Sequence, residues 1–128
     1  MIKSTRKIPF EFIFEEIESR APYVKPMFGA WAVYVDEKII FILRDRPSYP
    51  EDNGVWLATT GEHHASLRKD FPNMRSIQIF GAGPTGWQVL PVDADDFEDS
   101  VLKACRFVLS ADVRIGKIPK VKLKKSKK

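Results

Sequence analysis

The sequence predicts a two-layer α+β fold, with helices packed on a five-stranded antiparallel sheet. Over residues 8–20 and again after residue 96, apolar residues repeat at helical spacing. Between these two stretches, the apolar residues are mostly β-branched or aromatic and form short segments, which is typical of strands. Short turns join most of these segments, which favours antiparallel pairing. The expected order of elements along the chain is α-β-β-β-α-β-β-α.

The first element is expected to be an amphipathic helix over roughly residues 8–20. Its apolar positions recur at helical spacing, and glutamates occupy the other side. Pro9 suits the first turn of a helix, where a backbone N–H would have no partner. Pro22 is expected to end this helix, because a proline disfavours helical backbone in the residue before it.

Five strands are expected over residues 30–35, 39–43, 54–58, 76–80 and 86–90. The first two are joined by the short polar segment Asp36-Glu37-Lys38 and should form a β-hairpin. A polar loop over residues 45–53 leads to the third strand. The glycine-rich segment 81–86 is expected to be the turn between the last two strands. A phosphate-binding loop is not favoured there, because a strand follows and Pro84 removes an N–H donor.

Two more helices complete the predicted fold. Thr59, followed three residues later by Glu62, predicts a capping box that opens a short helix ending at Phe71-Pro72. The acidic run from Asp93 to Asp96 predicts the start of the last helix, with Asp93 capping free N–H groups. The buried stripe of this helix is expected to comprise Val101, Leu102, Cys105, Val108 and Leu109.

Charge divides the chain into a body, residues 1–113, and a C-terminal tail, residues 114–128. The tail has eight Lys or Arg and no Asp or Glu, and the body has 13 and 17, so they carry about +8 and −4. We expect the tail to be disordered and to add non-specific affinity for nucleic acid. If all eight cations, Arg114 and seven lysines, met phosphates, the log–log salt slope would be about −7. The expected contacts are Lys117, Lys120, Lys122, Lys124, Lys125, Lys127 and Lys128.

Two simpler roles for the tail stay open, a solubilising end or a segment that folds back onto the acidic body. Membrane binding is not favoured, because apolar residues are sparse and Gly116 and Pro119 would break a helix. No apolar run is long enough to span a membrane, and the apolar stretch near the N-terminus is interrupted by glutamates. With a single cysteine, Cys105, the cytoplasm is the expected compartment.

The segment from Lys25 to Lys38 resembles the start of the TfoX N-terminal domain family. Met27-Phe28-Gly29 follows the first predicted helix, and a Val-Tyr-Val-Asp pattern, residues 33–36, closes the next strand. The resemblance, which extends to the related MmcQ/YjbR-like domains, implies a two-layer fold of the secretion-chaperone type. It also implies a link to competence regulation and brings no catalytic residues. We expect Met27-Phe28-Gly29 to pack the sheet edge against the first helix, with a ligand-facing loop as the alternative.

The reactive residue types do not form a catalytic, metal or cofactor site in the sequence. His63 and His64 are adjacent, so on a helix they point about 100° apart and do not easily share a metal. Cys105 falls on an apolar stripe, which favours a buried thiol. The acidic residues after residue 92 lack the spacing of a calcium loop. We therefore expect no catalysis, no cofactor and no metal.

The tryptophans are the remaining candidates for a binding surface. Trp31, Trp56 and Trp87 lie in predicted strands, and with nearby arginines they could form a stacking platform for single-stranded nucleic acid. The arginines in question are Arg44, Arg46, Arg68 and Arg75. Core or dimer-interface positions are favoured for the three tryptophans.

Together these patterns predict a small non-catalytic binding or regulatory module. Its partner would be a protein of unknown identity, with a homodimer as an open alternative, and the tail would add contacts to nucleic acid. One alternative is a small-ligand binder or enzyme with a pocket near residues 27–29 and the 81–86 turn. Another is a chaperone-like protein-interaction module, by analogy of fold alone.

Overall fold

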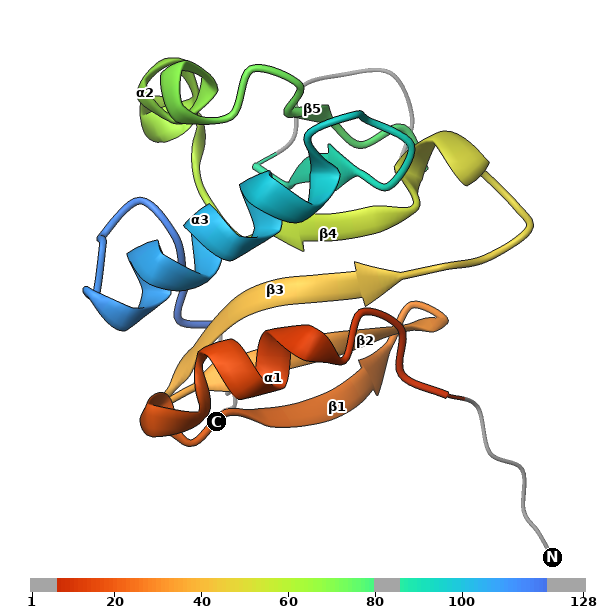
Figure 1. Cartoon of the computed structure of the whole chain (residues 1–128). Helices are drawn as coiled ribbons and strands as arrows, with labels where there is room; N and C mark the ends of the chain where they lie inside the picture. Colours follow the sequence, from red (N-terminus) through yellow and green to blue (C-terminus); the bar gives the residue numbers. More distant parts are fainter. Residues whose placement is uncertain (1–6, 80–85, 120–128) are drawn as a thin grey trace, which may run out of the picture.

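One antiparallel sheet organises the part of the chain that the computed structural model describes, residues 7–79 and 86–119 (Figure 1). Its six strands are β1 (Tyr23–Met27), β2 (Ala30–Val35), β3 (Lys38–Arg44), β4 (Gly54–Leu57), β5 (Arg75–Ser76) and β6 (Gln88–Pro91). Their order across the sheet is β1-β2-β3-β4-β6-β5. The α+β class with an antiparallel sheet is thus confirmed, with one strand more than the sequence predicted.

The additional strand is β1, which pairs with β2 at an edge of the sheet. Its sequence, Tyr-Val-Lys-Pro-Met, contains Pro26 and leaves Lys25 exposed. A proline cannot donate to a ladder, so a strand that contains one is confined to an edge. The same proline kept this segment from being predicted as a strand.

Three α-helices and three 3-10 turns accompany the sheet within the described residues. They are α1 (Phe12–Glu16), η1 (Glu18–Arg20), η2 (Pro50–Asp52), η3 (Gly61–His63), α2 (His64–Asp70) and α3 (Phe97–Leu109). The helix predicted over residues 8–20 is therefore shorter, because Ile17 leaves helical geometry and separates α1 from η1. Ala21, with a φ of 52°, then ends η1 just before Pro22.

The two predicted helix caps are not formed. At the start of η3 the N-cap is Thr60, and the Thr59 hydroxyl bonds to the Thr60 carbonyl rather than to a helical N–H. Before α3 the chain makes turns, and Asp96 rather than Asp93 becomes the N-cap, with no side-chain capping bond. The predicted end of α2 at Phe71 is correct, since the Phe71 N–H bonds to the Leu67 carbonyl.

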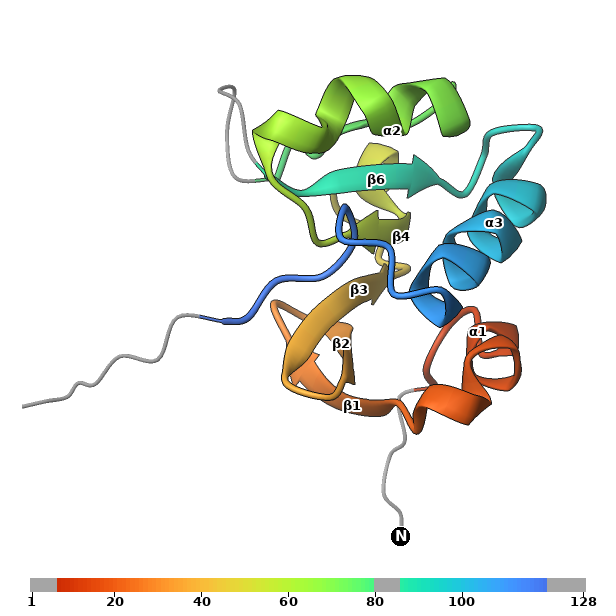
Figure 2. The ribbon, with the colours of Figure 1, turned by 90° about the vertical axis from the view of Figure 1, so that its left-hand side faces the viewer.

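The buried stripe of α3 is close to the prediction. Val101, Cys105 and Val108 are buried as expected. Ala104 is buried as well, whereas Leu102 is half-buried and Leu109 is 40% exposed. The stripe is thus centred slightly differently, because α3 lies across the sheet and also contacts α1 (Figure 2).

The core has two parts, one on each face of the sheet. The first contains buried residues from all three helices, including Ile13, Leu67 and Cys105, and from the central strands. The second contains strand residues on the opposite face, with Trp56 as its largest member. Residues of β2 alternate regularly between the two clusters, as a strand buried on both faces requires.

A β-bulge in β3 bends the sheet. Val33 pairs with Phe41, but the next residue, Tyr34, pairs with Ile39, so Ile40 is the extra residue on β3. Ile40 and Phe41 consequently both contribute to the helix-side cluster. Such an insertion increases the local twist of a strand. The bulge lies near the point where β4 ends and next to Ile39.

Candidate functional site

A segment that was predicted as tail is built into the sheet. Lys117 donates its N–H to the Ile39 carbonyl at 3.0 Å, and the Ile39 N–H donates back to the Lys117 carbonyl at 2.9 Å. The Gly116 N–H donates to the Ala58 carbonyl at 2.7 Å. β4 ends at Leu57, so this segment continues the pairing of β3 where β4 has stopped (Figure 2).

Two residue types make this docking sterically and energetically favourable. Ile115 is buried in the helix-side cluster, which anchors the segment by apolar contact. Gly116 has a φ of 118°, a conformation that residues with a Cβ rarely adopt. A Cβ at Gly116 would also lie 3.2 Å from the Lys38 side chain. Gly116 was expected only to break a helix, and it also lets the chain enter the sheet.

Arg114 is held by carboxylates of the body. Its guanidinium donates to Asp112 Oδ1 and Oδ2 at 3.0 and 2.8 Å, to Asp70 Oδ2 at 3.0 Å and to the Ser66 hydroxyl at 2.7 Å. The hydrogen bond from Arg114 lowers the pKa of Asp112, against the opposing effect of burial. In return, the Asp112 carboxylate raises the pKa of Arg114. This cation is therefore used internally and is not available to bind phosphate.

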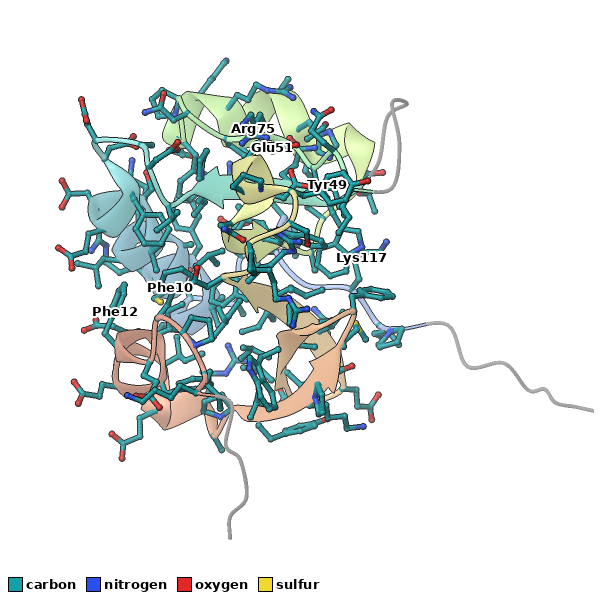
Figure 3. The ribbon with its side chains drawn as sticks, turned by 90° about the vertical axis from the view of Figure 1, so that its right-hand side faces the viewer. Phe10, Phe12, Tyr49, Glu51, Arg75 and Lys117 are labelled. Atoms are coloured by element: carbon teal, nitrogen blue, oxygen red, sulfur yellow. The ribbon has the colours of Figure 1, made fainter. Side chains whose placement is uncertain are left out.

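The predicted boundary at residue 113 therefore falls inside an ordered segment that extends at least to Lys117. Of the seven lysines expected to contact nucleic acid, Lys117 lies within the described residues. The other six, Lys120, Lys122, Lys124, Lys125, Lys127 and Lys128, lie outside them. The Lys117 ammonium lies near Gly86, since a Cβ at Gly86 would be 3.8 Å from Nζ. Figure 3 shows Lys117 on the side of the molecule away from Phe10 and Phe12.

Met27-Phe28-Gly29 forms the tight turn between β1 and β2. Met27 pairs with Ala30, and the two residues between them have φ angles of 56° and 75°. Two positive φ angles in a two-residue loop suit the twist of a β-hairpin. Met27 packs on the face away from the helices, and Phe28 is 58% exposed. The expectation that the motif packs against the first helix is therefore wrong.

A hollow of about 420 Å³ adjoins this turn. It is lined by the N-terminal segment, the β1–β2 turn and the loop after β3. In Figure 1 these backbone segments lie at the right-hand end of the sheet. Apolar groups line most of it: Ile8, Pro9, Ala30, Trp31, Leu43 and Pro47. Lys7, Asp45 and Arg46 are the charged lining residues. An alternative prediction was a pocket near residues 27–29 and the 81–86 turn. Of residues 27–29, Gly29 lines this hollow, whereas Met27 and Phe28 do not.

The loop that carries Asp45 and Arg46 is fixed by the buried side chain of Arg44. The Arg44 guanidinium donates to the Ser48 and Tyr49 carbonyls at 2.8 and 2.9 Å and to Asn53 Oδ1 at 2.8 Å. Asn53 Oδ1 also accepts the Arg46 N–H at 2.9 Å. Burial lowers the pKa of Arg44, and Asp52 opposes that shift. This network could not be predicted from the sequence, because arginine is seldom buried.

Asp52 holds the chain on the other side of this loop. Its fully buried carboxylate accepts the Gln78 and Ile79 N–H groups, at 2.9 and 2.7 Å from Oδ2. The Gln78 and Ile79 N–H groups are thereby taken from the ladder, and among the described residues of the strand predicted over 76–80, Ser76 is the one that pairs with β6. Arg75 also donates to the Glu51 carbonyl, and Figure 3 shows these two residues side by side with Tyr49 nearby. Phe80 and residues 81–85 of the turn predicted over 81–86 lie outside the described residues.

The three tryptophans do not form a common platform. Trp31 packs on the helix-side cluster, whereas Trp56 and Trp87 lie on the opposite face with their ring centroids 5.8 Å apart. Trp56 is buried, and its indole N–H donates to the Asp52 carbonyl at 2.8 Å. Arg44 is buried too. Trp56 therefore has the core position that was favoured, and neither Trp56 nor Arg44 is available for the alternative, a stacking surface for nucleic acid.

The two histidines and the cysteine each contact other parts of the fold. His63 lies beside Glu62, and His64 has a ring nitrogen 3.3 Å from the Gly86 carbonyl. Cys105 is buried, as predicted, and burial raises the pKa of its thiol to about 12. Glu16 acts in the same direction and Arg106 in the opposite one. Such a thiol stays protonated and is a poor nucleophile.

Residues 7–79 and 86–119 contain neither a metal-binding cluster nor a membrane-spanning helix. No three or more His, Cys, Asp or Glu residues of this part of the chain are grouped so that they could hold a metal ion. Every helix within it is too short or too polar to cross a membrane. Comparison of the chain with protein-family models, curated proteins and solved structures found no match. The resemblance to the TfoX N-terminal domain family therefore stays a prediction.

Proposed function

We propose that this chain is a small non-catalytic binding module of the TfoX N-terminal type whose basic C-terminal arm binds nucleic acid without sequence preference. The secretion-chaperone-like architecture and a protein partner or second copy on the sheet belong to the same proposal. So does a cytoplasmic location. The pairing of Lys117 with Ile39 is the observation that carries the role of the arm.

That pairing supports the proposal because it gives the arm a fixed origin. Residues 114–117 are docked on the body, and six further lysines follow Lys117 without any acidic residue. The body carries about −4, so its own charge repels phosphate. Affinity for nucleic acid would therefore come from the arm. Charge alone reads no base edges, so binding would be independent of sequence.

The experiment is fluorescence anisotropy with labelled 20-mer DNA and RNA. The intact chain is compared with a variant in which six lysines of the arm are replaced by glutamine: Lys120, Lys122, Lys124, Lys125, Lys127 and Lys128. A control variant carries Lys25→Gln and Lys69→Gln, two exposed lysines of the body. We expect the arm variant to lose most of its binding and the control to keep it. Absence of binding by the intact chain, or equal binding by the arm variant, would overturn the proposal.

A further inference from the structure

The hollow beside Gly29 has the dimensions of a site for a small molecule. Its volume of about 420 Å³ lies within the range of about 300–1,000 Å³ that is usual for ligand sites. The apolar lining comes from the N-terminal segment, β2, the end of β3 and the loop after it, with Trp31 and Leu43 among its larger side chains. Most ligand sites combine such an apolar lining with a few charged or polar groups that orient the ligand.

The charged residues of the hollow define which ligand it would take. Lys7 and Arg46 carry two positive charges and Asp45 carries one negative charge, so the lining is positive overall. Within the described residues, no carboxylate forms an ion pair with Lys7 or Arg46. One guanidinium nitrogen of Arg46, Nη1, donates to the Gly29 carbonyl at 3.2 Å. The Arg46 side chain is thereby oriented next to the hollow, with further N–H groups for an anion.

The Asn53 side chain fixes the backbone of Arg46 through two hydrogen bonds. The Arg46 N–H donates to Asn53 Oδ1, and the Arg46 carbonyl accepts from Asn53 Nδ2 at 2.8 Å. Asn53 is itself fixed by the buried Arg44. The Arg46 guanidinium, oriented by the Gly29 carbonyl, suits a carboxylate or a phosphate group, because its N–H donors can form two parallel hydrogen bonds.

We propose that this hollow binds a small organic anion, with its carboxylate or phosphate group on Arg46 and Lys7 and its apolar part against Trp31 and Leu43. This site is separate from the arm. The hollow lies at the end of β3, where Leu43 lines it, whereas Lys117 pairs with Ile39 near the start of that strand. Asp45 would weaken anion binding by repulsion and would favour ligands that also carry a hydrogen-bond donor.

Two-dimensional ¹H–¹⁵N NMR titration of the intact chain tests the proposal. The probes are 1-naphthoate and 1-naphthyl phosphate, which distinguish a carboxylate from a phosphate ligand. 1-Naphthalenemethanol serves as the neutral control. We expect saturable shifts of the Gly29 and Ala30 amides and of the Trp31 indole with at least one anion, and no saturation with the neutral probe. Absence of saturation with both anions, or equal binding of the neutral probe, would overturn the proposal.

Substitutions then test the assigned residues. Arg46→Gln should weaken binding of the anion about tenfold or more, the usual effect of losing a charged hydrogen-bond partner. Arg106→Gln is the matched control, because Arg106 is exposed on α3 and does not line the hollow. Asp45→Asn should strengthen binding about two- to fivefold by removing a repulsive charge. Equal loss in Arg46→Gln and Arg106→Gln would show an effect of total charge and contradict the site.

Discussion

Ile39 and Lys117, 78 positions apart in sequence, exchange two backbone hydrogen bonds of 2.9 and 3.0 Å. The exchange joins the end of the described chain to the middle of the sheet, at the place where β4 no longer pairs with β3. It changes the interpretation of the basic segment, since the part from Arg114 to Lys117 belongs to the fold.

Asp112→Asn should loosen the anchor of Arg114. The pKa of Asp112 is lowered in the folded chain, so the unfolded chain binds more protons in the window between the two pKa values. The stabilisation is complete above the unfolded pKa of about 3.9 and is lost as the pH falls through the folded value. Urea unfolding at pH 7 should show a loss of about 1 kcal/mol, the scale of a partly exposed ion pair. The difference between the two proteins should shrink progressively as the pH falls below the unfolded value of about 3.9, and a difference that stays constant from pH 7 into this acidic range would contradict the assignment.

Arg44→Gln should destabilise the body strongly. Arg44 is 2% exposed, and its loss removes donors from the Ser48 and Tyr49 carbonyls and from Asn53. These acceptors are buried or partly buried, and an acceptor that loses its partner there costs about 1–3 kcal/mol, so a total loss of about 3 kcal/mol is expected in urea unfolding. Arg46→Gln is the matched control, and its exposed side chain should change the free energy of unfolding by about 0.5 kcal/mol or less. Equal effects of the two substitutions would contradict the role given to Arg44.

Gly54→Ala should be among the most harmful small substitutions. Gly54 has a φ of 141°, and an added Cβ would lie 2.1 Å from the Leu90 carbonyl oxygen in the neighbouring strand. Backbone strain and overpacking each cost about 1–3 kcal/mol, so a loss of about 3 kcal/mol or more is expected. Gly61→Ala is the control, because a Cβ there meets nothing within 4 Å. Thermal denaturation that gives equal melting temperatures for the two variants would refute the close contact between β4 and β6.

The Cys105 thiol should be unreactive in the folded chain. Burial raises its pKa to about 12, whereas an unfolded cysteine has a pKa of about 8.5. The stabilisation that follows from this shift is complete below about pH 8.5 and is lost as the pH rises toward 12, by up to about 1.4 kcal/mol per pH unit. A thiol reagent should modify Cys105 at pH 8 only in denaturant. Stoichiometric modification of the native chain at a rate close to that in denaturant would contradict the burial of α3 on the sheet.

Elements with a local apolar pattern could be predicted from the sequence, and elements created by distant contacts could not. The β2–β3 hairpin and the buried position of Cys105 follow from periodicity within a few residues. β1 was missed because an edge strand tolerates Pro26 and exposed polar side chains. Residues 77–79 looked like part of a strand, but the N–H groups of Gln78 and Ile79 bond to Asp52, more than twenty residues earlier in the chain.

The same distinction applies to the candidate sites. The charge of the tail was evident from composition, but the role of Arg114 depends on Asp70, which is 44 residues away. The hollow joins Lys7, Gly29 and Arg46 from three separate segments, and no sequence spacing relates them. Met27-Phe28-Gly29 was interpreted as core because Met and Phe are usually buried. The positive φ angles of Phe28 and Gly29 instead make it a hairpin turn.

The salt dependence of DNA binding tests the central claim most directly. Arg114 is bonded to Asp112 and Asp70, so seven lysines from Lys117 onward remain for phosphate. Each contact with double-stranded DNA contributes about −0.9, which predicts a log–log slope of about −6 for the intact chain. With the six lysines after Lys117 replaced by glutamine, the slope should fall to about −1. A slope near zero for the intact chain, or the same slope for both proteins, would contradict the account of an anchored nucleic-acid arm.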